Sequence, residues 1–337
     1  MFLIQFEFMV EISNDVISRQ GFVDNRLFGI FEDPNVAAII SIYVIGFSTF
    51  NFQKVQNKFL KILNVLNIIF QFFYIVLSGS RTAEVSLFGA VAVVLYFLLR
   101  EKFSNKNFNK FIKEVLPVLT SVVCCVVILL SISLTRKGLS YLPVLIDFPK
   151  GESGSSFSQT HAIKHLDMER EDVADSSDIS NCRFKIWNSA IEIFKSKPLF
   201  GTSPRNMRSY AKAELPNNFI GQRGYAVHNA YIDVLASTGI LGALCIAIFF
   251  IKYLINIIKY FYLKKSRKNY LAVIFCLYFL ISSAVSAMFL SEIFFVSTIS
   301  VLIFWSFLGY CEFFMLKDDK KEISEIDKPS YSPKVGV

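Results

Sequence analysis

The sequence predicts an all-α polytopic membrane protein with about seven transmembrane helices and one large extracytoplasmic loop. Composition is the first observation: of 337 residues, 53% are hydrophobic and only 18% are charged, whereas soluble domains carry about 25% charged residues. The second observation is that the apolar residues form long uninterrupted runs. About 20 apolar residues in a row span a hydrocarbon core roughly 30 Å thick.

The chain opens with a short apolar stretch over residues 1–10, followed by a polar stretch over 11–35. Ten residues are too few to span a bilayer, and no small-residue cleavage site follows them, so this is not a signal peptide. We interpret the stretch as the last turns of a helix that begins upstream, and we expect the native protein to extend beyond Met1.

Seven apolar runs follow, and each is long enough to be a span. Asp33 and Pro34 open the first one as N-cap and first helical residue. The expected spans lie at about residues 34–52, 59–78, 82–100 and 115–134, and within residues 231–260, 270–290 and 293–316.

Lys and Arg cluster in alternate connections between these runs. The connections after the first, third and fifth spans, and the C-terminal tail, each hold at least three basic residues, whereas the other short connections hold only Arg81 and Glu292. By the positive-inside rule the basic connections face the cytoplasm, and they account for most of the net charge of +8. We therefore expect lipid rather than nucleic acid as the partner of these charges.

This alternation divides the chain into four expected regions. They are an N-terminal membrane region of four spans (1–134, with spans from about 34), an extracytoplasmic loop (135–228), a C-terminal membrane region of three spans (229–316) and a cytoplasmic tail (317–337).

The expected extracytoplasmic loop has two parts. Residues 151–180 are rich in Ser, Asp and Glu, and we expect no fixed structure there. Within 181–197, apolar residues recur at helical spacing up to Pro198. They predict an amphipathic helix on or near the membrane surface, where Trp187 would suit the interface.

The sequence gives little indication of a metal site or a disulfide framework. No CxxC spacing occurs among the six Cys. His161 and His165 are four residues apart, a spacing that could hold zinc on a helix, but they lie in the Ser- and Asp-rich stretch without a third rigid ligand. We expect no metal and no cofactor.

Arg81 lies in Ser-Gly-Ser-Arg-Thr between two apolar runs. A charge near the membrane is costly unless it is paired or wetted. The preceding run carries Asn64, Asn67 and Gln71 on one helical face, and such a stripe should face the bundle interior or a wet cavity. The alternative is that Arg81 pairs with Glu84 one turn later and only anchors the helix end.

Further charged candidates lie in the extracytoplasmic loop. Arg183 opens the amphipathic helix, and it either binds an anion or contacts lipid headgroups. Arg205, Arg208 and Arg223 follow in the same loop and are candidates for further anion contacts, or else a solvated basic face. His228 precedes the fifth span and could act as a base near neutral pH, or as a structural hydrogen-bonding group.

The expected topology brings Arg81, Arg183 and His228 to one face of the membrane, although they are far apart in the chain. Two guanidinium groups and one base at a membrane surface suit a reaction on a lipid-linked phosphate or pyrophosphate.

Three blocks of the sequence resemble the O-antigen ligase and polymerase family of bacterial membrane glycosyltransferases. In chain order, they are Asn25-Arg26-Leu27-Phe28-Gly29 with Asp33-Pro34-Asn35; Ser78-Gly79-Ser80-Arg81-Thr82; and Arg183 to Trp187, Pro198, Gly201, His228-Asn229-Ala230-Tyr231 and Thr238-Gly239-Ile240-Leu241-Gly242. Relatives usually carry several more spans before the Asn25 block, so this chain is short at its N-terminus.

The resemblance implies a GT-C-like fold and a metal-independent, inverting transfer of glycan from an undecaprenyl-pyrophosphate carrier. By this analogy Arg81 and Arg183 bind the pyrophosphate, and His228 is the catalytic residue that deprotonates or positions the acceptor hydroxyl. The enzyme would act in the bacterial cytoplasmic (inner) membrane, with the lipid-linked oligosaccharide as substrate and a flippase and a chain-length regulator as partners.

We therefore expect a polymerase of a surface polysaccharide, O-antigen or capsule, that joins lipid-linked repeat units. A ligase that moves the finished glycan to another acceptor is the first alternative, because donor and cationic residues would be shared. A membrane transporter is the second, although it should place ionisable residues near the bilayer midplane rather than at the surface. An inactive fragment is the third.

Overall fold

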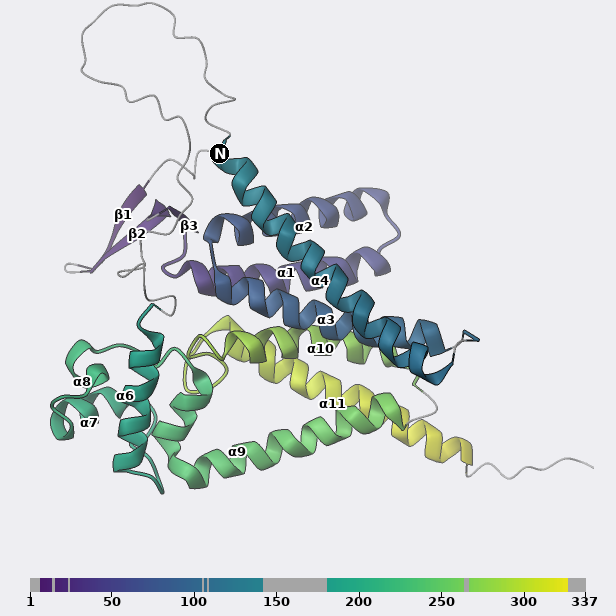
Figure 1. Cartoon of the computed structure of the whole chain (residues 1–337). Coiled ribbons are helices and arrows are strands. Elements are labelled where there is room, and N and C mark those ends of the chain that lie inside the picture. The colour runs from purple at the N-terminus through teal and green to yellow at the C-terminus, as the bar shows by residue number, and fades with distance from the viewer. Residues whose placement is uncertain are drawn as a thin grey trace, which may run out of the picture. The chain divides into compact units, whose positions relative to one another are not determined.

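The computed structural model describes residues 7–13, 16–23, 25–104, 106–107, 109–141, 181–263 and 267–326, and most of them are helical (Figure 1). The chain divides into two compact units. Unit 1 comprises Met1–Ala92 and Leu119–Cys182, and unit 2 comprises Val93–Val118 and Arg183–Val337. The chain passes from one unit to the other within α3 (Arg81–Ser104), within α4 (Lys110–Ser140) and between Cys182 and Arg183.

Within the described residues, six helices are long and apolar enough to cross a membrane. They are α1 (Pro34–Lys54), α2 (Lys58–Ser78), α3, α4, α9 (Ala230–Tyr262) and α11 (Ile299–Ile326), the last over its first 21 residues. Helix α10 (Tyr270–Ser286) is apolar but has only 17 residues. The polytopic helical class is thus confirmed. The sixth helix ends earlier than expected, at Ser286, and the seventh begins later than expected, at Ile299. Residues 287–298 between them form an irregular segment.

The beginning of α1 follows from its sequence. The Asp33 side chain accepts a hydrogen bond from the Asn35 backbone N–H at 2.7 Å, and Pro34 is the first helical residue. Further along, the expected polar stripe of α2 meets α1 inside unit 1. There the Asn67 amide donates to the Ser48 hydroxyl at 2.9 Å and accepts from Gln71 at 3.2 Å. The stripe therefore ties two apolar helices together.

A small antiparallel sheet precedes the helices, in the order β1 (Glu7–Ser13), β2 (Val16–Val23) and β3 (Arg26–Gly29). The expectation that residues 1–10 end a helix is wrong for residues 7–10, which belong to β1. The apolar residues Phe8, Val10 and Ile12 alternate with other residues, and this period of two is typical of a strand. The all-α prediction thus describes the membrane region but omits this sheet.

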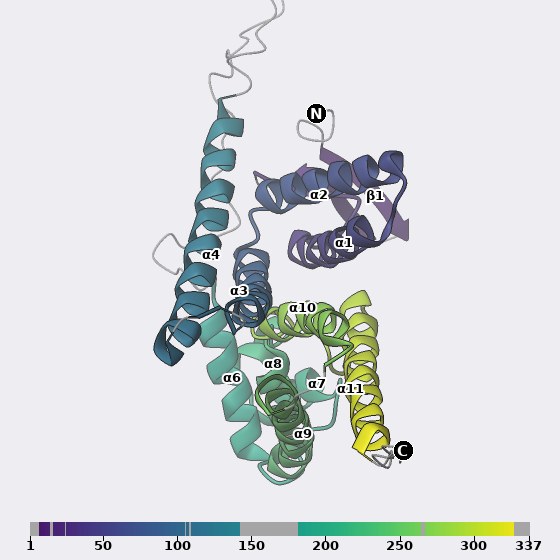
Figure 2. The same cartoon turned by 90° about the vertical axis from the view of Figure 1, so that its right-hand side faces the viewer.

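Three short helices of unit 2 form a satellite core against the start of α9 (Figures 1 and 2). They are α6 (Arg183–Ser196), α7 (Met207–Glu214) and α8 (Phe219–Arg223). Buried Ile186 and Ile193 of α6 pack in one cluster with Met207, Ile220 and Ala236. The amphipathic helix is confirmed. Protein covers Ile186, Ala190 and Ile193 of its apolar face, whereas Phe184 at its beginning is 65% exposed.

Two glycines allow the loop after α6 to dock into α9. Gly239 interrupts the helix with φ 65° and ψ −171°, a conformation essentially restricted to glycine. The Ile240 N–H then donates to the Pro198 carbonyl at 2.8 Å, and the Ser203 N–H donates to the Ser237 carbonyl at 2.8 Å. A Cβ on Gly201 would lie 2.4 Å from the Ser237 carbonyl, so both glycines are required by backbone-to-backbone contact.

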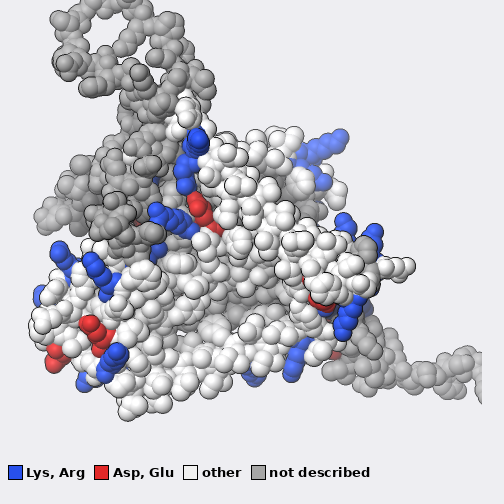
Figure 3. Space-filling view, in the orientation of Figure 1, with Lys and Arg blue, Asp and Glu red and all other residues white. Residues whose placement is uncertain are grey.

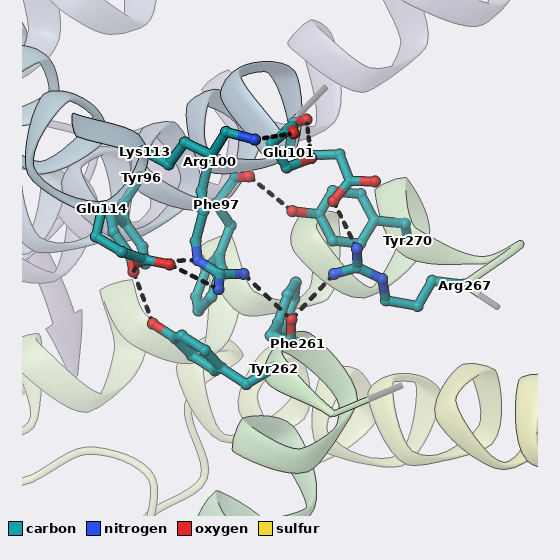
Figure 4. Close-up of polar contacts among 11 residues, drawn as sticks. Tyr96, Phe97, Arg100, Glu101, Lys113, Glu114, Phe261, Tyr262, Arg267 and Tyr270 are labelled. Atoms are coloured by element: carbon teal, nitrogen blue, oxygen red, sulfur yellow. Dashed lines mark hydrogen bonds and ion pairs between the residues drawn. The ribbon is translucent and has the colours of Figure 1, made fainter. Parts of the chain in front are cut away.

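Charged side chains hold together the opposite end of α9 in unit 2 (Figure 4). The Arg100 guanidinium donates to both Glu114 oxygens at 3.0 and 3.1 Å, and Arg267 donates to Glu101 at 2.6 Å. Both arginines also donate to the Phe261 carbonyl, at 3.4 and 3.1 Å. Basic residues of the third and fifth connections therefore bind protein groups and do not serve only as contacts for lipid headgroups.

Candidate functional site

The turn that bears Arg81 is built by the ends of α2 and α3 in unit 1. Gly79 ends α2 in the left-handed conformation at φ 60°. Buried Ser80 then caps α3, because its hydroxyl accepts the Ala83 N–H at 3.2 Å and its carbonyl accepts the Glu84 N–H at 3.1 Å. Arg81 is the first residue of α3 and is exposed. An exposed guanidinium at a helix N-terminus favours an anion, since the helix dipole adds positive charge there.

Two further arginines fix this turn from elsewhere in unit 1. Arg26, on β3, is only 3% exposed, and its Nε donates to the Ser78 carbonyl at 2.7 Å. Arg136, on α4, donates to the Val76 carbonyl at 3.2 Å and pairs with Glu84 at 2.7 Å. The last carbonyls of a helix have no partner within it, and here two guanidinium groups bind them. Through its pair with Arg136, Glu84 joins α3 to α4.

His228 lies immediately before α9 in unit 2, in the left-handed region at φ 51°. Histidine enters that region less readily than glycine, and a residue held there marks an over-determined site. Asn229 is the N-cap of α9 and accepts the N–H groups of Tyr231 and Ile232 at 3.0 and 3.1 Å. The His228 N–H donates to the Ser291 hydroxyl at 3.1 Å. The cap and this bond together fix the backbone that carries the imidazole.

Arg183 meets the same part of unit 2 from α6. Its guanidinium carbon lies 5.6 Å from the centroid of the Phe289 ring, within the range of a cation–π contact. Phe289 and Ser291 both belong to the irregular segment 287–298, and the Ala230 N–H donates to the Ala287 carbonyl at 2.8 Å. One segment between α10 and α11 thus supports both Arg183 and the turn bearing His228.

An apolar cavity of about 530 Å³ lies between α9, α10 and α11. Tyr231, three residues after His228, lines it, and its hydroxyl donates to the Ala284 carbonyl at 2.8 Å. Most of the remaining lining is aliphatic or Phe, including Phe250 and Phe294. Apolar cavities of this size hold apolar ligands or chains.

The predicted site residues are therefore distributed over both units. Arg183 and His228 meet one segment of unit 2, whereas Arg81 belongs to unit 1. The additional arginines of the loop, Arg205, Arg208 and Arg223, are exposed. Among the described residues, no hydrogen bond or ion pair joins these three to segment 287–298. The surface over α6–α8 is mostly basic, because Glu192 and Glu214 are the two acidic residues among eight Lys and Arg between Arg183 and Arg223 (Figure 3). The anion contacts of these three arginines stay a prediction.

His161 and His165 lie outside the described residues. In the part of the chain that is described, no group of three or more His, Cys, Asp or Glu side chains could hold a metal ion.

Sequence reasoning did not assign roles to Arg26, Arg136 or segment 287–298. Arg26 could have been noticed, because a basic residue shortly before an apolar run is costly without a partner. Arg136 carried no such signal, since it follows the fourth run among other polar residues. Segment 287–298 is rich in apolar residues, so the sequence predicted that parts of it belong to the sixth and seventh spans.

Comparison with known proteins places the chain in a family. The family model described as O-antigen ligase matches residues 66–247, more than half of the chain. The chain belongs to the O-antigen ligase family. No curated protein and no solved structure matches it. The matched region includes Arg81, Arg183 and His228 and excludes the sheet and segment 287–298.

Membership confirms the family resemblance, and the matched region contains the second and third blocks but not the first, over residues 25–35. It identifies a multi-pass membrane protein with an activity of the O-antigen ligase and polymerase type, which is glycosyltransferase-like.

Proposed function

We propose that this protein is a surface-polysaccharide polymerase that transfers glycan from undecaprenyl-pyrophosphate-linked repeat units to a sugar hydroxyl. The observation that carries the proposal is that Arg183 and the turn bearing His228 rest on the same segment, 287–298. A cation for a phosphate leaving group and a base for a hydroxyl are the two groups that such a transfer needs.

In the proposed reaction, the imidazole of His228 accepts the proton of the acceptor hydroxyl as the oxygen attacks the anomeric carbon. The bond between that carbon and the pyrophosphate oxygen breaks, and the configuration inverts because attack comes from the opposite side. The leaving pyrophosphate gains negative charge, which Arg183 and Arg81 stabilise. Fixed guanidinium groups stabilise developing charge well because they need no reorganisation during the reaction.

The cavity between α9, α10 and α11 is evidence in favour of a polyprenyl-linked donor. Its lining is mostly apolar and includes Tyr231, three residues from the proposed base. Part of a polyisoprene chain would be shielded there from water, while its pyrophosphate lies toward His228. The bilayer supplies the rest of the chain with an apolar surrounding.

The ligase alternative uses the same donor and the same cations and differs only in the acceptor. The transporter alternative is less well supported. Arg26, Glu292 and Asp318 are three charged side chains of the described residues that are at most 3% exposed, and all three lie outside the spans or at the end of one. A transporter is expected to place such groups near the middle of its helices.

The proposed setting is the outer face of a bacterial cytoplasmic membrane, where a flippase would deliver the lipid-linked units and a chain-length regulator would set polymer size. The alternation of basic connections supports this orientation.

The test is transfer by purified protein in proteoliposomes supplied with synthetic lipid-linked repeat units. A ladder of lipid-linked polymers, formed equally with and without EDTA, is expected, and NMR of the new linkage should show the configuration opposite to that of the donor. A parallel arm offers lipid A-core as acceptor. A single product on that acceptor without a ladder would identify a ligase, and no transfer in either arm would contradict the proposal.

A further inference from the structure

Glu292 is a buried acid beside the candidate site, and the proposed reaction does not use it. It lies in segment 287–298 and is only 2% exposed. A glutamate is seldom buried so fully, because removing a carboxylate from water costs free energy unless the protein supplies polar partners. A buried acid next to a reactive centre therefore calls for a specific role.

One partner of this carboxylate is the last residue of α10. The Ser286 hydroxyl, which is fully buried, lies 3.0 Å from a Glu292 carboxylate oxygen. The Ser283 carbonyl lies at the same distance from that hydroxyl and competes for its single proton. An ionised carboxylate is the stronger acceptor of the two. The bond between Ser286 and Glu292 closes the chain into a loop, residues 286–292, which we name the supporting loop.

Three contacts join the supporting loop to Arg183 and the His228 turn. Ala287 accepts the Ala230 N–H at 2.8 Å, Phe289 lies beneath the Arg183 guanidinium, and Ser291 accepts the His228 N–H at 3.1 Å. The three contacts lie between the two ends that the Ser286–Glu292 bond joins. Anything that opens the loop changes all three together.

The backbone directly after Glu292 is strained. Ile293 has φ 64°, a conformation that is unusual for a β-branched residue. Its carbonyl accepts the Trp305 indole N–H at 2.9 Å, and its side chain is 1% exposed. Such a conformation persists only where surrounding contacts hold it, and here the Trp305 bond and the burial of the side chain do so.

We propose that Glu292 is a positioning residue for glycan transfer, and this inference rests on the proposed function. By accepting the Ser286 hydroxyl, it closes the supporting loop that fixes Arg183 and the His228 backbone relative to each other. A shift of about 1 Å in a reacting group can lower a rate roughly 100-fold. Glu292 therefore acts through the loop, without touching the substrate.

Three variants test this role. In Glu292→Ala the loop loses its closing bond, and kcat should fall about 10- to 100-fold in protein that remains folded. Glu292→Gln keeps an oxygen acceptor for Ser286, and its kcat should stay within about threefold of wild type. Ser286→Ala removes the donor with little change in volume and should also lower kcat. It replaces Glu292→Ala as the test if that variant does not fold.

Asp318 provides a matched control, because it is an equally buried acid on α11 that binds Tyr260 and Asn269 instead. Asp318→Ala should lower the melting temperature without lowering the kcat of the folded fraction. A fall in kcat in this variant as large as in Glu292→Ala would overturn the proposal, because loss of any buried acid would then suffice.

Hydrogen exchange measured by mass spectrometry, without substrate, gives a readout independent of activity. The amides of His228 and Ala230 should exchange roughly tenfold faster in Glu292→Ala than in wild type, and near the wild-type rate in Glu292→Gln and Asp318→Ala. If folded Glu292→Ala shows wild-type exchange or wild-type kcat, the positioning role of Glu292 is wrong and the proposed function still stands. The same conclusion follows if Glu292→Gln is as impaired as Glu292→Ala. Wild-type protein that transfers no glycan overturns the proposed function and this role with it.

Discussion

Replacing Arg26 should release the turn that carries Arg81. The side chain is 3% exposed and donates to the Ser78 carbonyl at 2.7 Å and to the Asn35 side chain at 2.9 Å. Each bond from a charged donor contributes about 1.5–3 kcal/mol. The amine of Arg26→Lys cannot reproduce the guanidinium fork, so one of the two bonds should be lost. The expected destabilisation is therefore about 1.5–3 kcal/mol.

The melting temperature of the purified protein in detergent measures this change. A loss of 1 kcal/mol lowers the melting temperature by roughly 2–4 °C in a protein of about 150–250 residues and by less in a longer chain. A fall of a few degrees is therefore expected for Arg26→Lys in this protein of 337 residues. Glycan transfer should fall as well, because Ser78 lies three residues before Arg81. Lys58→Arg is the control, since Lys58 is exposed at the beginning of α2 and is not a candidate site residue, and it should change neither quantity.

An Arg26→Lys protein that melts like wild type would show that the two bonds do not stabilise the fold. If the melting temperature falls as expected while transfer by the folded fraction stays normal, the turn at Arg81 does not depend on Arg26.

Three further substitutions test the site and its frame. Arg81→Lys keeps the charge but loses the fork, and transfer should fall roughly 10- to 1000-fold; near-normal turnover in a well-expressed Arg81→Ala protein would return Arg81 to an anchoring role. His228→Ala should lower kcat by about 100-fold or more if the imidazole is the base, and normal turnover would remove it from the mechanism. Gly239→Ala should lower stability by about 3 kcal/mol or more, measured as melting temperature, because the new Cβ would lie 2.4 Å from the Leu199 carbonyl at a φ of 65°. Gly138→Ala, where no atom lies within 4 Å, is its control and should melt at or above the wild-type temperature.

The sequence by itself determined the membrane class, the approximate spans and several local structures. Hydropathy over about 20 residues decides whether a helix can cross a bilayer, and that quantity is a local property of the chain. The cap at Asp33 and the helix beginning at Arg183 are likewise set by neighbouring residues. The family could be identified because its short blocks keep their order along the chain. The strand over Glu7–Ser13 was also visible locally, as an alternation that an apolar run obscured.

Only the tertiary structure decided which distant residues support the candidate site. Arg26 binds a carbonyl 52 residues away, and His228 binds a hydroxyl 63 residues away. Such pairs depend on how complete helices pack, so no window of local sequence contains them. Apolar composition cannot distinguish the last turn of a buried helix from a buried irregular segment, since both exclude water. For that reason, segment 287–298, with its strained backbone and its buried Glu292, became visible only when α10, α11 and the start of α9 were packed together.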